Sequence, residues 1–406
     1  MEVLPKDEFQ LVKGPLMTTV FPNASTANQN SQTTDGATNR SAGISTAPIP
    51  IIVRTELPKR IQAAYTTRFV DEAIRRDPEE FHLLSGPGLH PRSGDVVVAR
   101  VTNVGNHKRI ETPTSRKAIL FEGALVMVAY GNRYAADQFL AYVPDSLATT
   151  SLVAAGGLAG EVVAAHTRVS EPTEIEPLGL LANHSGVVNL NDFAPFENLP
   201  VTESRERRER PEVIGVLGTS MNSGKSTVMA NLINGLAKSG RTVTAGKITG
   251  TGAGNDPMIY HDAGAAKVLD FTDFGYPTTF QLDMQEILAL TINLVEHLTE
   301  PDTDVVVVEI ADGIFQDETA KLLRDPIFHN TIDQVLFAAT DALGARAGVH
   351  ELCDVGLKVA AASGVLTSSP LATREANDVL AKFETPVLGT FDLSLPEVAE
   401  SLLLRK

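Results

Sequence analysis

Short apolar runs alternate with amphipathic stretches over the second half of the chain. The runs predict buried strands near 213–218, 242–248, 304–310, 334–340, 357–363 and 386–390. The stretches between them repeat apolar residues at helical spacing and predict helices near 226–238, 284–299, 343–353, 370–383 and 396–404. Strands that alternate with helices are typical of a parallel sheet with helices on its faces. We therefore expect an α/β domain over 212–406.

The pattern before residue 200 is different, because short strands follow one another with turn residues between them. It predicts a helix near 69–76 and strands near 51–55, 95–101, 117–121, 124–130 and 139–143. Glu122-Gly123, between two of these strands, predicts a hairpin. We expect a smaller β-rich domain over 51–200, either a small barrel or another compact module.

Two further segments lack a sustained apolar period. Residues from about 18 to 50 are rich in Thr, Ser, Asn, Gln, Ala and Gly. We expect residues 1–50 to form a disordered tail, with partner binding as the alternative. Residues 201–211 carry alternating Arg and Glu. They predict a solvated interdomain linker, with a phosphate-binding patch as the alternative.

The strongest chemical signal is the glycine-rich turn that follows the strand near 213–218. Residues 218–226 read Gly-Thr-Ser-Met-Asn-Ser-Gly-Lys-Ser. In such a turn, at the start of a helix, backbone N–H groups point at phosphate oxygens. Lys225 would reach the β- and γ-phosphates, and the Ser226 hydroxyl would bind Mg²⁺. The residues expected to contact the nucleotide here are Gly218, Thr219, Asn222, Ser223, Gly224, Lys225, Ser226 and Thr227.

The exact form of this turn resembles one group of P-loop enzymes. The strict pattern has glycine at position 219, whereas here the glycine lies one residue earlier, at Gly218. This displaced form is similar to the loop of dethiobiotin synthetase and of the amidotransferases that make cobyric acid. Ser220 stands where partitioning and division-site ATPases have an extra lysine, which disfavours that branch. The resemblance begins at about residue 212.

The chain is also similar to a P-loop family that joins such a domain to a small N-terminal domain. These resemblances imply an α/β fold, in which a parallel-sheet P-loop NTPase domain is preceded by a smaller β-rich domain and a disordered N-terminal tail.

A second glycine-rich loop follows the strand near 242–248, which ends at Lys247. Alternate glycines at 250, 252 and 254 let the backbone approach a ligand closely. A lysine at a ligand-facing strand end could neutralise a carboxylate and a transferring phosphoryl group. The resemblance to dethiobiotin synthetase, which has a lysine there, implies the same role. We expect Lys225 and Lys247 to be catalytic and the substrate contacts to be Lys247, Gly250, Thr251, Gly252 and Gly254. A surface lysine before a flexible loop is the alternative.

Two carboxylates complete the predicted magnesium site with Ser226. Asp256 directly follows the glycine loop, and Glu309 ends a run of four valines. A strand of this kind carries the magnesium-ordering carboxylate in P-loop enzymes. The resemblance to dethiobiotin synthetase implies a glutamate at this strand end followed by a glycine-containing loop. Asp312 departs from that pattern and is either a second carboxylate or a turn cap.

The loop over 364–370 occupies the place where related enzymes hold the base. Thr367 and Ser368 are its candidate nucleotide contacts. It has no Asn-Lys-x-Asp signature for guanine, which favours ATP over GTP. The aromatic segment 271–280 either lines the substrate site, forms a dimer contact or packs structurally.

Bulk properties limit the partners. The formal net charge of −16 argues against a general nucleic-acid or acidic-membrane surface. No apolar run reaches transmembrane length, and an acidic start differs from a signal peptide, so we expect a cytoplasmic protein. The single cysteine, Cys353, allows no intramolecular disulfide, and its apolar neighbours predict burial. A homo-oligomer is compatible with all of this.

These features lead to one main expectation and one alternative. The main expectation is an enzyme that uses ATP and Mg²⁺ to activate a small carboxylic acid by phosphoryl transfer and then closes an amide or ring, as a ligase does. The alternative is a nucleotide-dependent switch or assembly factor whose ATP hydrolysis is coupled to a protein partner.

Overall fold

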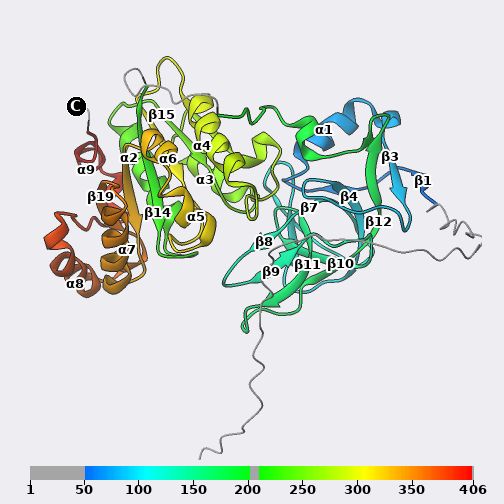
Figure 1. The fold of residues 1–406 in the computed structure, drawn as a ribbon, viewed down its shortest axis with the longest axis horizontal. Coiled ribbons are helices and arrows are strands. Elements are labelled where there is room, and N and C mark those ends of the chain that lie inside the picture. The colour runs from blue at the N-terminus through cyan, green and yellow to red at the C-terminus, as the bar shows by residue number, and fades with distance from the viewer. Residues whose placement is uncertain (1–50, 202–209, 405–406) are drawn as a thin grey trace, which may run out of the picture. The chain divides into compact units, whose positions relative to one another are not determined.

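Two large β-sheets organise the protein, and each is built from its own stretch of chain (Figure 1). The computed structural model describes residues 51–201 and 210–404. Both sheets belong to one compact unit, Pro50–Lys406. The predicted tail, 1–50, and residues 202–209 of the predicted linker lie outside the described residues. The division into domains at 201–211 stays a prediction.

The second sheet is the predicted parallel one. It has six strands in the order β16-β15-β17-β14-β18-β19, all parallel. The strands are β14 (Glu212–Gly218), β15 (Val243–Lys247), β16 (Lys267–Asp270), β17 (Val305–Glu309), β18 (Gln334–Ala338) and β19 (Val359–Ser363). Because they are parallel, their carboxyl ends meet at one edge, and the loops that follow them share that edge.

Helices cover both faces of this sheet. They are α2 (Lys225–Lys238), α3 (Asn255–Asp262), α4 (Met284–Leu298), α5 (Asp317–Leu322), α6 (Pro326–Thr331), α7 (Ala342–Asp354), α8 (Pro370–Leu380) and α9 (Pro396–Ser401). Alternate residues of β14 enter two separate apolar cores. Val213 and Leu217 pack with α4–α8, whereas Ile214 and Val216 pack with α2, α3 and α9. Burial of each such side chain stabilises the fold by about 1.5–3 kcal/mol.

The first sheet has 11 strands and lies within 53–187. Its strands are β1 (Val53–Glu56), β2 (Gln62–Ala63), β3 (His82–Ser85), β4 (Val96–Asn103), β7 (Leu125–Tyr130), β8 (Arg133–Tyr134), β9 (Phe139–Tyr142), β10 (Thr150–Ala154), β11 (Leu158–Ala165), β12 (Thr173–Asn183) and β13 (Gly186–Val187). Most pairs are antiparallel, with β7 parallel to β2 and β11. Helix α1 (Arg68–Arg76) follows β2, and we call residues 51–201 the β-rich region. Among the described residues, none of the helices combines the length and apolar character that a membrane span requires.

Three local predictions were wrong. The predicted hairpin at Glu122-Gly123 does not form, because β6 (Lys117–Ile119) pairs with β5 (Arg109–Glu111), while β7 pairs with β4. The predicted strand near 386–390 is reduced to one isolated bridge between Val387 and Ala362. Cys353 is exposed rather than buried, because it lies on the outer face of α7. The sequence reasoning also missed β16, α3, α5 and α6, since each is short.

The two regions contact one another through buried polar groups. The Arg68 guanidinium donates to Asp273 Oδ1 at 2.7 Å and to Thr272 Oγ1 at 2.8 Å. The Tyr65 hydroxyl donates to Asp270 Oδ2 at 3.0 Å. Burial and the neighbouring Asp270 raise the pKa of Asp273 to about 6, although Arg68 opposes the rise. Among residues 51–201 and 210–404, the negative charge at this contact is paired directly by Arg68 alone.

The contact predicts a large loss of stability in Arg68→Ala, because Asp273 would stay buried without its cation. We expect the free energy of unfolding to fall by about 3 kcal/mol. The matched control is Arg75→Ala on the same helix, where the side chain is 75% exposed and pairs with Asp71. That change should cost no more than about 0.5 kcal/mol. Urea unfolding measures both, and equal midpoints for the two variants would contradict the expectation.

Candidate functional site

The phosphate loop, residues 218–226, connects the end of β14 to the start of α2 as predicted. Two of its residues take the left-handed conformation, Asn222 with φ 61° and Gly224 with φ 97°. This backbone turns the chain sharply before α2 begins at Lys225. A Cβ at position 218 would lie 2.3 Å from Ser223 Oγ and 2.9 Å from Lys225 Cγ, so any side chain there would force residues of the loop to shift. The glycine displaced by one residue is thus explained by close packing inside the loop.

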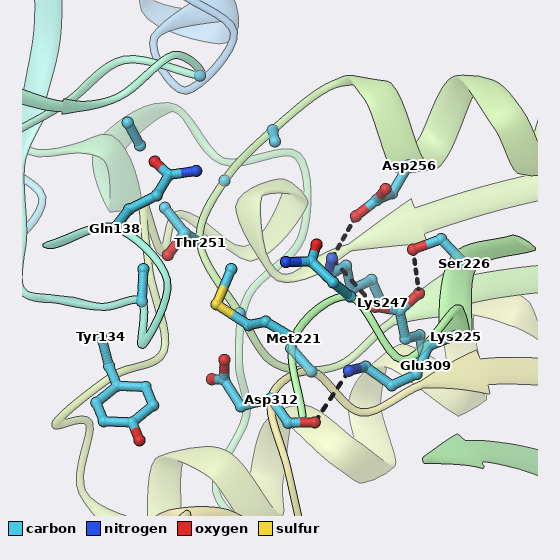
Figure 2. Close-up of a pocket in the computed structure, with 18 of the residues that line it drawn as sticks. Tyr134, Gln138, Met221, Lys225, Ser226, Lys247, Thr251, Asp256, Glu309 and Asp312 are labelled. Atoms are coloured by element: carbon cyan, nitrogen blue, oxygen red, sulfur yellow. Dashed lines mark hydrogen bonds and ion pairs between the residues drawn. The ribbon is translucent and has the colours of Figure 1, made fainter. Parts of the chain in front are cut away.

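Lys225 is buried with its amine turned back onto the loop. Its Nζ donates to the carbonyl oxygen of Ser220 at 2.9 Å. It also donates to the carbonyl oxygen of Asp312 at 3.0 Å (Figure 2). Burial lowers the pKa of Lys225, and the Glu309 carboxylate opposes this. Two buried hydroxyls of the loop, on Thr219 and Ser223, have no hydrogen-bond partner among the described residues. The loop therefore has a cation and unused polar groups where phosphate oxygens would bind.

Glu309 lies at the end of β17 and is shared by three elements. Its carboxylate accepts hydrogen bonds from Ser226 Oγ, at 3.0 Å, and from the Tyr260 hydroxyl. Its other oxygen lies 3.3 Å from Lys247 Nζ. The side chain of Glu309 is only 3% exposed, so these contacts compensate a charge that burial would otherwise make costly.

Lys247 lies between two carboxylates, those of Glu309 and Asp256 (Figure 2). Burial alone would lower the pKa of Lys247, but Glu309 and Asp256 raise it overall. Burial likewise opposes ionisation of Asp256, yet Lys247 lowers the pKa of that carboxyl. Lys247 is therefore charged and fully engaged with protein carboxylates.

The three residues predicted to hold Mg²⁺ do converge. Ser226 contacts Glu309 directly, and Lys247 joins Asp256 to the same carboxylate. Within 51–201 and 210–404, no three His, Cys, Asp or Glu side chains form a metal-binding cluster. Mg²⁺ usually keeps waters and takes one or two carboxylates plus phosphate oxygens. The donor set of Ser226, Asp256 and Glu309 fits that requirement.

A cavity of about 650 Å³ opens beside the phosphate loop. One wall comes from the loop itself, Lys247, Asp256, Glu309 and Asp312. The other wall comes from the β-rich region, chiefly the β8–β9 hairpin with Arg133, Tyr134 and Gln138. In Figure 2, Tyr134 and Gln138 lie on one side of the pocket and Lys225, Ser226 and Glu309 on the other.

The hairpin also holds the phosphate loop directly. Asn222 Nδ2 donates to Asp137 Oδ2 at 2.7 Å, and Asp137 lies between β8 and β9. Sequence reasoning found none of Arg133, Asp137, Gln138 or Tyr260. These residues follow no motif. Asp137 pairs with a residue 85 positions away and Tyr260 with one 49 positions away.

The predicted substrate loop, 250–254, divides between two environments. Gly250, Thr251 and Gly252 line the cavity, whereas the Gly254 N–H donates to Glu111 Oε2 at 2.7 Å in the β-rich region. A Cβ at Gly156 would lie 1.9 Å from the Gly252 carbonyl oxygen. Part of the close approach that these glycines permit is therefore to protein backbone.

The remaining predicted nucleotide contacts line a second cavity of about 520 Å³. Thr367 and Ser368 share it with Phe391 and Asp392. Both cavities are bounded by Gly224 and Thr227 at the start of α2. The aromatic segment 271–280 does not provide an exposed platform at its start, because Phe271 and Phe274 are 1% and 2% exposed in the core.

Comparisons with known proteins give only distant likenesses. No family model matches the chain, and no curated protein matches it. The structure is similar to that of the signal recognition particle receptor FtsY from Elizabethkingia anophelis in complex with GDP. The two chains are 16% identical, the match covers 53% of this chain and 70% of that chain, and the TM-score is 0.33. FtsY from Physcomitrella patens chloroplasts gives 18% identity, 53% and 71% coverage, and a TM-score of 0.33. The chain carries a P-loop on a parallel α/β sheet.

The expectation of an ATP-dependent ligase is wrong. The solved structures named above are receptors, one of them with GDP, and not ligases. The site supplies a physical reason as well. Lys247 was expected to neutralise an acidic substrate, but its charge is already compensated by Asp256 and Glu309. The resemblance of the loop to that of dethiobiotin synthetase stays a prediction.

Asp312 predicts a pH-dependent stability. It has φ 61°, and burial raises the pKa of its carboxyl from 3.8 to about 6. Since ionisation is disfavoured only in the folded state, the protein loses stability as pH rises from about 4 through about 6. Asp312→Asn removes that loss, and Asn tolerates the left-handed backbone.

We expect Asp312→Asn to be more stable than the wild type by roughly 1–3 kcal/mol at pH 7.5, with a smaller difference at pH 4.5. Urea unfolding at both pH values measures this. Asp262→Asn, at a side chain 84% exposed, is the control and should show no such trend. A difference that is independent of pH would contradict the role of burial.

Proposed function

We propose that this protein is a nucleotide-dependent switch. It binds a nucleoside triphosphate with Mg²⁺ at the phosphate loop, and hydrolysis changes a contact that a protein partner senses. The observation that carries the proposal is the hydrogen bond from Asn222, in the phosphate loop, to Asp137 in the β8–β9 hairpin. It joins the loop that would hold the phosphates to a separate sheet.

The loop supports the binding step through its backbone and Lys225. The N–H groups at the start of α2 and the positive end of that helix attract phosphate oxygens. Lys225 would exchange its bonds to the carbonyls of Ser220 and Asp312 for bonds to phosphate. The amine is already desolvated, so it loses little hydration when phosphate arrives.

Magnesium would be held by Ser226 and by the carboxylates of Glu309 and Asp256. When bound, it would neutralise charge on the phosphate oxygens. The Ser226 hydroxyl would turn from Glu309 toward the metal, and Tyr260 and Lys247 would continue to hold Glu309 in place.

The base would occupy the second cavity, beside Thr367, Ser368 and the exposed ring of Phe391. That ring is 75% exposed and offers a face on which a purine can stack. We propose ATP as the nucleotide, because residues 364–370 lack the Asn-Lys-x-Asp sequence that reads guanine. Binding of ATP and GTP is compared in the experiment below.

Phosphate would couple the phosphate loop to the β8–β9 hairpin, because it would displace the present hydrogen-bond partners of Lys225. The carbonyl of Asp312 and the loop backbone are partners of Lys225 only while phosphate is absent. Asn222, three residues earlier in the same loop, carries the contact with Asp137. A change in loop conformation would therefore reach the hairpin, and differential contacts in the two states are what a switch requires.

Lys225→Ala should abolish high-affinity nucleotide binding, because no other amine lies in the loop. Calorimetric titration with Mg·ATP and with Mg·GTP should show at least a tenfold loss of affinity for the preferred nucleotide. Lys238→Ala, at the far end of α2, is the matched control and should bind normally. Equal affinities in the wild type and Lys225→Ala would sink the proposal.

Asp137→Ala should separate binding from signalling. Hydrogen exchange of the wild type should change in β8 and β9 when Mg·ATP binds. The variant should bind nucleotide with similar affinity but lose that change, since the bond to Asn222 is gone. Asp145→Ala, at an exposed position after β9, is the control. If nucleotide leaves the hairpin unchanged in the wild type, the switch is excluded.

A further inference from the structure

Arg133 is a buried cation that forms no ion pair with a carboxylate of residues 51–201 or 210–404. It is the first residue of β8, and 6% of it is exposed. Its Nη2 donates to Gln138 Oε1 at 3.0 Å. Its Nε and Nη1 are buried and have no hydrogen-bond partner among the described residues. A guanidinium left with unused donors in this way is costly to bury, and an anionic ligand would relieve that cost.

The position of Arg133 beside a cavity indicates that its guanidinium binds a ligand rather than a structural partner. Arg133 and Gln138 line the 650 Å³ cavity that the phosphate loop also lines. Burial lowers the pKa of Arg133 to about 10, and Asp137 and Asp312 oppose the fall. It remains charged near neutral pH, therefore, and those two carboxylates act on it without forming an ion pair.

The neighbouring histidine does not compete for an anion. His107 lines the same wall, and burial followed by the charge of Arg133 lowers its pKa to about 4. The ring is thus neutral at physiological pH. Its Nδ1 lies 3.1 Å from the Leu152 carbonyl, which can only accept, so Nδ1 carries the hydrogen. The positive charge on this wall is that of Arg133.

The cavity also has room beyond the phosphate loop. The proposed base site is a separate cavity that meets this one at Gly224 and Thr227. Only the terminal phosphates and Mg²⁺ of a nucleotide would therefore enter the larger cavity, beside Lys225 and Glu309. The part lined by Arg133, Gln138 and Gly156 is left for a second molecule.

We propose that Arg133 and Gln138 form a binding site for a small molecule that carries a carboxylate or phosphate group. The site is on the wall that the β-rich region supplies and does not require a nucleotide. Because Nε and Nη1 are buried in the structure without a ligand, the guanidinium would turn toward the cavity to bind the anion through them, with the Gln138 side chain as the partner of Nη2. Because Asp137 lies on the same hairpin, the ligand would act on the element that also contacts Asn222.

The test is calorimetric titration of the full chain, without nucleotide, using succinate and inorganic phosphate as separate probes. Arg133→Gln should weaken binding of the cognate probe by about tenfold or more, because a charged hydrogen-bond donor is lost. Arg133→Lys should keep part of the affinity. Arg109→Gln, at an exposed arginine of β5, is the matched control and should bind as the wild type does.

Two further measurements separate this site from the phosphate loop and from a structural role. Lys225→Ala should keep the Arg133-dependent binding, even if phosphate loses a second site at the loop. Thermal unfolding of Arg133→Gln without ligand should occur at or above the wild-type temperature, because an unpaired buried charge has been removed. A succinate-specific loss would assign a carboxylate ligand, and a phosphate-specific loss a phosphate ligand.

The proposal is overturned if neither probe binds the wild type, or if Arg133→Gln binds both probes unchanged. It is also overturned if Lys225→Ala alone removes all binding, which would place the anion in the phosphate loop only. Failure of the nucleotide switch would appear instead in the Lys225→Ala titration with Mg·ATP, so the two results can be told apart.

Discussion

Glu309 carries a negative charge at the end of β17, where its side chain is almost completely buried. An unpaired carboxylate in this position would be strongly disfavoured, so Ser226, Tyr260 and Lys247 must all reach it. These three residues come from α2, α3 and β15. The same hydrogen bonds that make the buried charge tolerable therefore set the positions of the helix that follows the phosphate loop and of the loop after β15. The stability of this end of the sheet and the geometry of the site have one cause.

Contacts with the β-rich region also tie the stability of the fold to the geometry of the site. Its polar contacts to the parallel sheet, from Arg68, Tyr65 and Glu111, all reach loops at the carboxyl edge of that sheet. Asp137 reaches the phosphate loop itself. These are the loops in which a ligand would bind, so a change at the site acts on contacts between the two regions. Lys225 and Arg133 lie on different walls of one cavity, and the negative charge of a ligand there would attract both side chains.

Much of the parallel sheet could be predicted from the sequence, because its signals are local. The valines before Glu309 and the glycine-lysine turn at 224–225 each report a strand or a loop within a few residues. The contact between Ser226 and Glu309 followed from the rule that parallel strands share one edge. Tyr260 could not be found, because its partner Glu309 lies 49 positions away. Arg133 could not be found, because only the folded chain brings it to the cavity that the phosphate loop also lines. The hairpin at Glu122-Gly123 was wrong for a related reason: a turn signal reports that the chain bends, not which strand it then meets.

The contact between Gly156 and Gly252 limits how this protein can change over evolutionary time. The atom that a side chain at position 156 would meet is a backbone oxygen, so no change of rotamer could relieve the clash. Substitution elsewhere in the core can be absorbed by repacking of neighbours, but here it would require the two regions to separate. Residues around the cavity can therefore vary only while the turns that contain Gly156 and Gly252 keep their shape. An insertion in one of these turns would be tolerated only with a matching change in the other.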